Sequence, residues 1–325
     1  MTTTTTTTAT TPRSAVKVSG LRKAFGAKTV LDGIDLDIAE GAVFALLGPN
    51  GAGKTTTVQI LSTLLRADAG EILVAGHDPV RQAQAVRAAI GVTGQFSAVD
   101  ALLTGEENLR LMADLHHLER AAGRRRARAL LEQFDLVGAA GQVAATYSGG
   151  MRRRLDLAMT LMGDPRIIFL DEPTTGLDPR SRRTMWQIIR ELTAGGVTIL
   201  LTTQYLEEAD QLADRVAVLD QGRVAAEGTP AELKGRIPGG HARLHFADQG
   251  AYDTAVAALG GIPGDNESLT LQVPNDGDPR SLRELLDRLD RHAVRAERIT
   301  IHAPDLDDVF FALTGHPQQT REDPV

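Results

Sequence analysis

Residues 48–55 read Gly-Pro-Asn-Gly-Ala-Gly-Lys-Thr and lie between an apolar run at 42–47 and apolar positions of helical spacing at 58–65. The stretch matches the Walker A pattern, in which glycines let backbone N–H groups point inward and hold phosphate oxygens at the start of a helix. In this pattern Lys54 reaches the β- and γ-phosphates of a nucleotide, and the Thr55 hydroxyl binds Mg²⁺. Lysine occurs at only five positions of the chain, so a chance match has odds of about one in a hundred. The sequence therefore predicts a nucleotide-binding loop between a strand and a helix.

A second motif ends another predicted strand. Residues 167–172 read Ile-Ile-Phe-Leu-Asp-Glu, four apolar residues followed by two carboxylates, which matches the Walker B pattern. On its own this pattern fits an ordinary strand end equally well, but downstream of a Walker A loop it becomes specific. Asp171 is then expected to hold the Mg²⁺ shell, and Glu172 is expected to polarise the attacking water as general base.

The segment that precedes the second motif separates the classes of ATPase that share both. Residues 147–151 read Tyr-Ser-Gly-Gly-Met, and Ser-Gly-Gly alone is typical of a flexible loop. Between the two Walker motifs the segment resembles the signature of the ATP-binding cassette (ABC) family, Leu-Ser-Gly-Gly-Gln, with Tyr147 in place of the leucine and Met151 in place of the glutamine. In that family the serine and the glycine amides open a helix and bind the γ-phosphate held by the other subunit. The resemblance implies the same role for residues 148–150.

The resemblance spans residues 16–235 and implies roles for four more positions. Phe25 resembles the aromatic residue that stacks on adenine, although a core phenylalanine would fit the same pattern. Gln95 resembles the Q-loop glutamine, which touches Mg²⁺ and relays the nucleotide state to the membrane subunit, and Asp178 resembles the D-loop aspartate that crosses the dimer interface. Gln204 stands where most members of the family have a switch histidine. An amide can donate a hydrogen bond to the γ-phosphate but does not titrate near neutral pH.

The predicted site therefore has three groups of residues, and its predicted cofactors are ATP and Mg²⁺. The catalytic group is Glu172, Gln204 and Lys54, and the Mg²⁺ group is Thr55, Gln95 and Asp171. The nucleotide-binding group, part of which is implied by the resemblance alone, is Phe25, Gly48, Pro49, Asn50, Gly51, Ala52, Gly53, Lys54, Thr55, Thr56, Ser148, Gly149, Gly150 and Asp178.

Three segments together resemble one subfamily, the daunorubicin-resistance type of exporter ATPase. They are residues 147–151, the stretch Thr-Thr-Gln-Tyr-Leu-Glu-Glu-Ala-Asp at 202–210, and Leu-Asp-Asp-Val-Phe at 306–310. The resemblance implies an ATPase that powers export of an antibiotic or lipophilic drug through a permease on a separate, six-helix chain. Within the transporter class, the alternative transported substrates are a lipid, a polysaccharide or an imported solute.

The order of the strand and helix patterns predicts an α/β fold. Residues 15–47 carry three strand patterns, and the segment 96–165 has a helical pattern rich in Leu, Ala and Arg. From Arg166 apolar strands alternate with amphipathic helices up to a hairpin at 215–226. This alternation predicts a largely parallel sheet with its ligand at the carboxyl ends of the strands. The resemblance implies a P-loop NTPase core of the ABC type with a helical signature subdomain at about 96–165.

The chain is expected to have a large domain followed by a smaller one. An Ile-Pro-Gly-Gly stretch at 237–240 is the expected linker between them. The smaller domain alternates strand and helix patterns three times, which is compatible with a ferredoxin-like α+β module. The expected boundaries are a disordered threonine-rich tail at 1–14, a nucleotide-binding domain at 15–236, a C-terminal accessory domain at 241–315 and a second tail at 316–325.

Composition excludes several classes of protein. Hydrophobic residues make up 42% of the chain, which is enough for a sizeable core, and the net charge of −7 argues against a nucleic-acid partner. The chain has no cysteine, so thiol chemistry is excluded. No apolar run reaches the roughly 20 residues of a membrane-spanning helix, so we expect that the chain does not cross a bilayer by itself. The resemblance to transporter ATPases implies a peripheral subunit at the cytoplasmic face of the cell membrane. The arginine clusters at 124–128, 152–154 and 180–183 are expected to be solvated helix faces paired with acids. The alternative for these clusters is contact with anionic lipid headgroups or with the permease.

Each motif occurs once in the chain, so we expect a two-fold homodimer that binds two ATP molecules head to tail. Two other classes of protein share the Walker motifs. Soluble translation or DNA-repair cassettes usually carry two cassettes or a long coiled-coil insertion, whereas only about fifty residues separate Gln95 from Ser148, without sustained heptads. A non-catalytic regulatory module is opposed by the intact Walker lysine and carboxylates, although Gln204 keeps it open.

Overall fold

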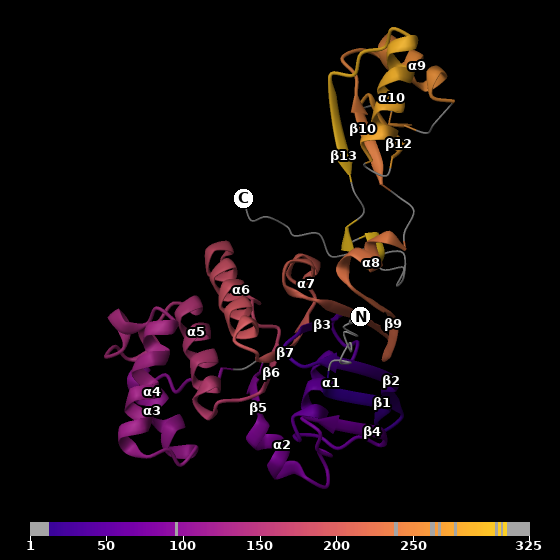
Figure 1. The fold of residues 1–325 in the computed structure, drawn as a ribbon. Coiled ribbons are helices and arrows are strands. Elements are labelled where there is room, and N and C mark those ends of the chain that lie inside the picture. Colours follow the sequence, from indigo (N-terminus) through magenta and orange to yellow (C-terminus); the bar gives the residue numbers. More distant parts are fainter. Residues whose placement is uncertain are drawn as a thin grey trace, which may run out of the picture. The chain divides into compact units, whose positions relative to one another are not determined.

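The computed structural model divides the chain into two compact units, residues 1–230 and 231–325, which are described separately (Figure 1). Residues 1–12 of the predicted tail 1–14, residues 237–239 of the predicted linker, the predicted tail 316–325 and the predicted ligand Gln95 lie outside the described residues. The residues that the structure describes are 13–94, 97–236, 240–260, 264–265, 268–275, 278–302, 305–306 and 308–310.

The first unit is built on a six-stranded sheet with the strand order β5-β6-β7-β3-β8-β9. The first five strands run parallel, and β9 forms an antiparallel hairpin with β8. Both β3 and β6 are buried along their whole length, which explains why they read as continuous apolar runs. The strands are β3 (Val43–Leu47), β5 (Ile90–Thr93), β6 (Ile167–Asp171), β7 (Thr198–Thr203), β8 (Arg215–Asp220) and β9 (Arg223–Gly228). The predicted parallel sheet is confirmed.

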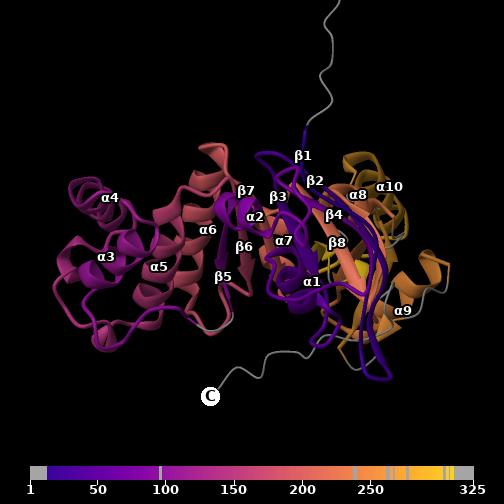
Figure 2. The same cartoon turned by 90° about the horizontal axis from the view of Figure 1, so that it is seen from below.

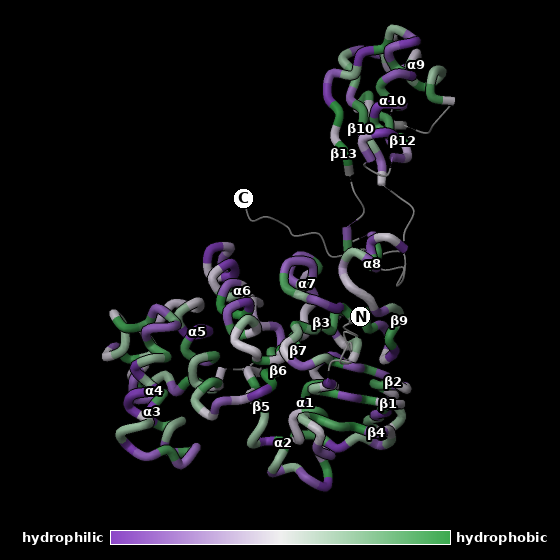
Figure 3. The backbone as a smooth tube through the Cα atoms, in the orientation of Figure 1, coloured by the Kyte–Doolittle hydropathy of each residue, from purple (hydrophilic) through white to green (hydrophobic). Residues whose placement is uncertain are grey.

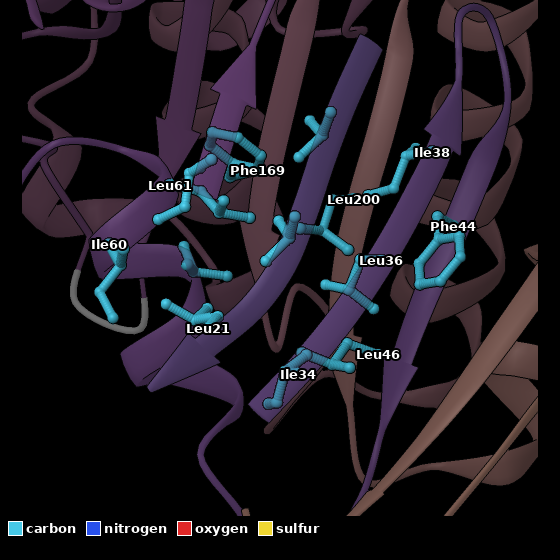
Figure 4. Packing of buried hydrophobic residues seen from close by; sticks show 14 of the residues in the cluster. Leu21, Ile34, Leu36, Ile38, Phe44, Leu46, Ile60, Leu61, Phe169 and Leu200 are labelled. Carbon is cyan, nitrogen blue, oxygen red and sulfur yellow. The ribbon is translucent and has the colours of Figure 1, made fainter. Parts of the chain in front are cut away.

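A second sheet in this unit is antiparallel, with the order β2-β1-β4. Its strands are β1 (Ser14–Phe25), β2 (Lys28–Ala39) and β4 (Ala69–Val74). The inward side chains of β1 and β2 pack with those of the central strands into one hydrophobic cluster (Figure 4). Members of this cluster labelled in Figure 4 are Leu21, Ile34, Leu36, Ile38, Phe44, Leu46, Ile60, Leu61, Phe169 and Leu200. The cluster fixes the antiparallel sheet against the parallel one and so fixes the hairpin that carries Phe25.

Helices cover the parallel sheet on both faces (Figures 1 and 2). Helix α1 (Lys54–Leu61) lies in the hydrophobic cluster between the two sheets, whereas α6 (Pro179–Ala194) and α7 (Leu206–Leu212) pack on each other and on the other face. The apolar pattern predicted α1 to continue to Leu65, and that prediction is wrong. Thr63 has a left-handed φ of 67°, which ends the helix and leaves Leu64 exposed. A short helix, α2 (Ala83–Ala89), precedes β5.

The segment predicted to be helical forms three α-helices, α3 (Gly105–Leu115), α4 (Arg120–Gln133) and α5 (Gly149–Thr160). It also has short 3-10 helices at Val137–Ala139, Ala144–Thr146 and Leu161–Gly163. A capping box in which Thr104 and Glu107 exchange hydrogen bonds starts α3, which is why this helix begins at 105. Hydrophobic and hydrophilic stretches alternate along these helices, as expected for amphipathic helices packed on one another (Figure 3). Within the described part of the chain, no helix combines the length and apolar character required to cross a bilayer.

The second unit has a four-stranded antiparallel sheet with the order β11-β12-β10-β13. In chain order this is β-α-β-β-α-β with the split arrangement of ferredoxin-like folds, as the alternating patterns predicted. The patterns missed β11, because two residues are too short to show a period. The elements are α8 (Pro230–Gly235), β10 (His241–His245), α9 (Gln249–Ala258), β11 (Gly264–Asp265), β12 (Thr270–Pro274), α10 (Pro279–Arg291) and β13 (Arg298–His302).

Candidate active site

The predicted nucleotide-binding loop, residues 48–53, is called the phosphate loop below. It follows β3 at the carboxyl end of the sheet. Two of its glycines are required by close packing and by backbone conformation. A Cβ on Gly48 would lie 2.3 Å from the carbonyl oxygen of Leu219, and Gly53, with φ of 110°, would place a Cβ 2.4 Å from the side chain of Leu31. Gly51 is also left-handed, with φ of 82°. The loop can therefore approach a ligand along its backbone, and α1 begins immediately after it at Lys54.

Lys54 is folded back into its own loop. Its ammonium donates hydrogen bonds to the carbonyl oxygens of Gly48 at 2.6 Å and Pro49 at 3.1 Å, and it lies 3.6 Å from a carboxylate oxygen of Glu172. Lys54 is only 4% exposed. This burial lowers the pKa of Lys54 below its usual range, although the carboxylates of Glu172 and Asp171 oppose the change. A buried ammonium next to two carboxylates and a glycine-rich loop is suited to holding a polyanion.

Asp171 joins the end of β6 to two neighbouring elements. Its Oδ1 accepts a hydrogen bond from the Thr55 hydroxyl at 3.3 Å and another from the Thr202 hydroxyl. Thr55 is the second residue of α1, and Thr202 is in β7, the strand between β6 and β3. The sheet thus brings together a hydroxyl and a carboxylate that are 116 positions apart in the chain.

Glu172 occupies a left-handed backbone conformation, with φ of 49°. A non-glycine residue in this region costs about 1–3 kcal/mol and persists only where its surroundings hold it. Here its N–H donates to both the carbonyl and the hydroxyl oxygens of Thr202, each at 3.1 Å, and its carboxylate accepts from the Thr175 hydroxyl at 3.3 Å. The turn directs the carboxylate towards Lys54, where it is 13% exposed. A partly exposed carboxylate in a strained turn beside the phosphate loop fits the expected position of a general base.

Gln204 follows β7, whose last residue, Thr203, accepts a hydrogen bond from the Gly48 N–H at 3.3 Å. The two-residue connection to α7 is braced by the Tyr205 N–H, which donates to the Thr203 hydroxyl at 2.9 Å. Gln204 is half-buried and lies at the same edge of the sheet as the phosphate loop and the two carboxylates. Its placement is compatible with a donor directed at the γ-phosphate.

The signature residues are arranged differently. Ser148 caps α5, with its Oγ accepting the Met151 N–H at 3.2 Å, and both Ser148 and Gly149 are exposed. Gly150 is buried, and a Cβ there would lie 2.5 Å from Oγ of Ser181 on α6. The helix N-terminus therefore presents exposed backbone amides, which is a ready site for an anion.

Asp178 and Phe25 are the remaining predicted nucleotide contacts. Asp178 caps α6 by accepting the N–H groups of Arg180 and Ser181 and the Ser181 hydroxyl at 2.6 Å, and these hydrogen bonds lower the pKa of its carboxyl. Phe25 is 51% exposed at the end of β1, with the Lys23 ammonium 5.4 Å from its ring centre, so the core interpretation of this residue is wrong. An exposed ring at a hairpin end is free to stack on a planar base.

The residues at the edge of the sheet suit Mg²⁺ chemically. Mg²⁺ prefers oxygen ligands and keeps several waters and substrate oxygens in its shell. The Thr55 hydroxyl and the Asp171 carboxylate are hard oxygen donors that already lie within hydrogen-bond distance of each other. The remaining predicted ligand, Gln95, is outside the described residues.

Two charged residues that the sequence patterns missed are buried behind the site. Glu208 on α7 accepts hydrogen bonds from the Thr174 hydroxyl at 2.8 Å and the Trp186 indole at 3.1 Å, and its burial raises the pKa of its carboxyl. Its spacing of four residues before the buried Leu212 was the available signal. The side chain of Arg153 on α5 is only 12% exposed, so the prediction that its cluster is a solvated face is wrong for this residue. Arg154, which is 18% exposed, and Arg182, which lies over the ring of Tyr205, are further exceptions.

The chain is similar to known ATP-binding proteins in sequence and in fold. Residues 31–175 match the model of a family described as "ABC transporter". The chain is 49% identical over 311 residues to daunorubicin resistance ATP-binding protein DrrA3 of Streptomyces coeruleorubidus, covering 95% of this chain and 98% of that protein. It is 46% identical to daunorubicin/doxorubicin resistance ATP-binding protein DrrA of Streptomyces peucetius, covering 96% of each. Among solved structures, an ATP-binding subunit of an ABC transporter matches with a TM-score of 0.62 at 30% identity, covering 68% of this chain and 92% of that one.

Proposed function

Because the chain belongs to the ABC transporter family of ATP-binding proteins, we propose that its ATP hydrolysis drives export of a drug or antibiotic through a separate membrane permease. The observation that carries the chemistry is the meeting of Lys54, Asp171 and Glu172 at one edge of the sheet. The drug-export assignment rests on the similarity to two daunorubicin-resistance ATP-binding proteins over nearly the whole chain.

Each residue of the site has a role that its placement supports. The backbone amides of the loop and Lys54 bind the phosphates, and Phe25 stacks on the base. Glu172 accepts a hydrogen bond from the attacking water and polarises it. Gln204 donates a hydrogen bond to the charge that develops on the γ-phosphate. Thr55 and Asp171 would hold Mg²⁺. The bound ion would neutralise charge on the phosphates.

The signature residues complete the site of a second copy of the chain. Ser148 and Gly149 are exposed at the start of α5, and the Ser148 side chain contacts its own helix. In a head-to-tail homodimer the backbone amides of Ser148 and Gly149 bind the γ-phosphate held by the partner subunit. Asp178 lies at the interface between the two copies. Docked on the permease, the dimer acts at the cytoplasmic face of the membrane as a peripheral subunit, with no nucleic-acid partner.

A transport assay tests the drug assignment. Inside-out vesicles that contain the chain and a co-expressed candidate permease should accumulate daunorubicin when ATP is added. Vesicles with Lys54→Ala should not accumulate it, because the phosphates lose their buried ammonium. Hydrolysis of ATP without accumulation of daunorubicin would contradict export of this drug while leaving the ATPase assignment intact.

The second unit is assigned to permease binding or to stabilisation of the dimer. It is a compact ferredoxin-like module with its own hydrophobic core, which includes Leu244, Tyr252, Leu271 and Leu285. A chain that ends after Arg236 should therefore bind ATP normally but confer no resistance in cells. Full resistance at equal expression would show that the module is dispensable.

A further inference from the structure

Helix α5, which begins with the signature residues, carries a buried ion pair on its inner face. Arg153 and Asp156 are one helical turn apart, with a guanidinium nitrogen 3.5 Å from a carboxylate oxygen. Their side chains are only 12% and 3% exposed. Charged side chains are seldom buried to this extent unless every part of them has a partner. The partners of this pair therefore show what the pair holds.

The guanidinium of Arg153 holds the turn that follows β6. It donates to the carbonyl oxygens of Asp171 at 3.1 Å, Glu172 at 3.3 Å and Pro173 at 2.9 Å. These are three consecutive residues, two of which carry the carboxylates of the site. A planar guanidinium with five N–H donors can bind several carbonyl oxygens in one fixed orientation, which a lysine ammonium cannot reproduce.

The same pair holds the chain on both sides of residues 95 and 96. Before them, Arg153 donates to the carbonyl oxygen of Gly94 at 2.9 Å. After them, Asp156 accepts the N–H of Ala98 at 3.1 Å and a hydrogen bond from the side chain of Ser97. One ion pair on α5 thus joins the helix to the flanks of the Gln95 segment and to the turn that carries Glu172.

We propose that Arg153 is a positioning residue that ties the signature helix to the Glu172 turn, so that movement of α5 changes the geometry of hydrolysis. This inference rests on the proposed role of Glu172 as general base. The turn needs an external restraint because Glu172 is held in a left-handed conformation, with φ of 49°. Without Arg153, the three carbonyl oxygens lose their common donor and the turn is free to relax.

The expected effect is on turnover rather than on ATP binding. The phosphate loop and α1 make no hydrogen bond to Arg153 among the described residues, and Lys54 is held by Gly48 and Pro49. A displacement of about 1 Å in a reacting group can lower a rate by about 10²-fold. Loss of Arg153 should therefore lower kcat while the Kd for ATP stays nearly constant.

Arg154 offers a matched control on the same helix. Its guanidinium also donates to a backbone carbonyl oxygen, that of Phe134 at 2.9 Å, and it also pairs with an acid, Asp135. These partners lie within the helical layer and include no residue of the predicted site. Arg153→Gln and Arg154→Gln therefore remove the same chemistry from neighbouring positions and differ in whether the Glu172 turn loses its donor.

The experiment uses the full-length chain with four variants, Arg153→Gln, Arg153→Lys, Arg154→Gln and Arg154→Lys. For each we would measure kcat and KM for MgATP, the Kd for ATP under conditions without turnover, and the melting temperature. Arg153→Gln should lose about 10–10² fold in kcat with a Kd within about two-fold of the parent. Arg153→Lys should show a smaller loss, because it keeps the charge and part of the bonding. Both Arg154 variants should retain the parental kcat.

Parental kcat in a folded Arg153→Gln variant would overturn the proposal, as would equal losses of kcat in the two Gln variants. If Arg153→Gln does not fold, Arg153→Lys decides, and the parental rate in that variant overturns the proposal. If the parent chain itself does not hydrolyse ATP, or if Glu172→Gln has no effect on its turnover, the proposed function fails instead. Those results come from the parent and from Glu172→Gln, so the two failures are distinguishable.

Discussion

The phosphate loop and the signature segment differ in where their polar groups find partners. Around the loop, the Lys54 ammonium lies 3.6 Å from a carboxylate oxygen of Glu172, and the Thr55 hydroxyl lies 3.3 Å from a carboxylate oxygen of Asp171. The two members of each pair come from distant parts of the chain. At the signature, Ser148 is exposed, and its hydroxyl oxygen accepts a hydrogen bond from its own helix.

This difference separates what one chain completes from what it leaves open. The phosphate loop has its lysine, its hydroxyl and its carboxylates already placed, so folding of a single chain assembles it. The signature has exposed backbone amides at the N-terminus of α5, which attract an anion. These amides lie on a different element from the phosphate loop. We infer that the loop side of the site is complete in the monomer and that the signature side acts on the nucleotide of a partner.

The largest effect is expected on the loop side. Glu172→Gln keeps the shape of the side chain but removes the base, so turnover should fall by about 10²–10⁴ fold while ATP binding is retained. The ATP-bound dimer should accumulate, because closure does not require hydrolysis. Steady-state turnover and size-exclusion chromatography with ATP measure the two effects. Unchanged turnover in the purified variant would refute the general-base assignment.

A smaller effect is expected at Gln204, which lies at the same edge of the sheet. Gln204→Ala removes a donor worth about 2.7–4 kcal/mol in the transition state, so turnover should fall by about 10²–10³ fold. Gln204→His should retain activity and acquire a pH dependence near its pKa of about 6.5, because only the histidine titrates between pH 5 and 8. A pH–rate profile at saturating MgATP measures both variants. If Gln204→Ala hydrolyses ATP at the parental rate, Gln204 is not a switch residue.

The smallest expected change in rate tests whether the loop side and the signature side of one site come from different copies of the chain. Lys54→Ala damages the loop side and Ser148→Arg damages the signature side, so each homodimer is defective at both of its sites. A head-to-tail heterodimer has one site with both lesions and one with neither. An equal mixture that exchanges subunits should recover to about a quarter of the parental rate, since half of the dimers carry one intact site of two. If confirmed heterodimers are no more active than the two variants alone, the head-to-tail arrangement is wrong.

Several features could be predicted because they depend on neighbours in the sequence. A glycine-rich loop before Lys54, an apolar strand before Asp171 and the period of the helices all express local backbone preferences and one-sided burial. The same local patterns predicted the ferredoxin-like order of the second unit, apart from the two-residue β11. The apolar spacing does not predict where a helix ends at a turn. At Thr63 a left-handed residue ends α1 four positions earlier than the apolar spacing indicated.

The sequence alone determined the class of fold and the position of the phosphate loop, and it indicated the residues that we propose to carry the chemistry. Only the tertiary structure decided which polar groups meet, because pairing between strands that are distant in the sequence sets those contacts. It placed Thr55 against Asp171 across 116 positions and held Glu172 in a left-handed turn. It also separated Arg153 from Arg154, since a helix rotates adjacent residues by about 100° and directs one towards the site and the other into the helical layer.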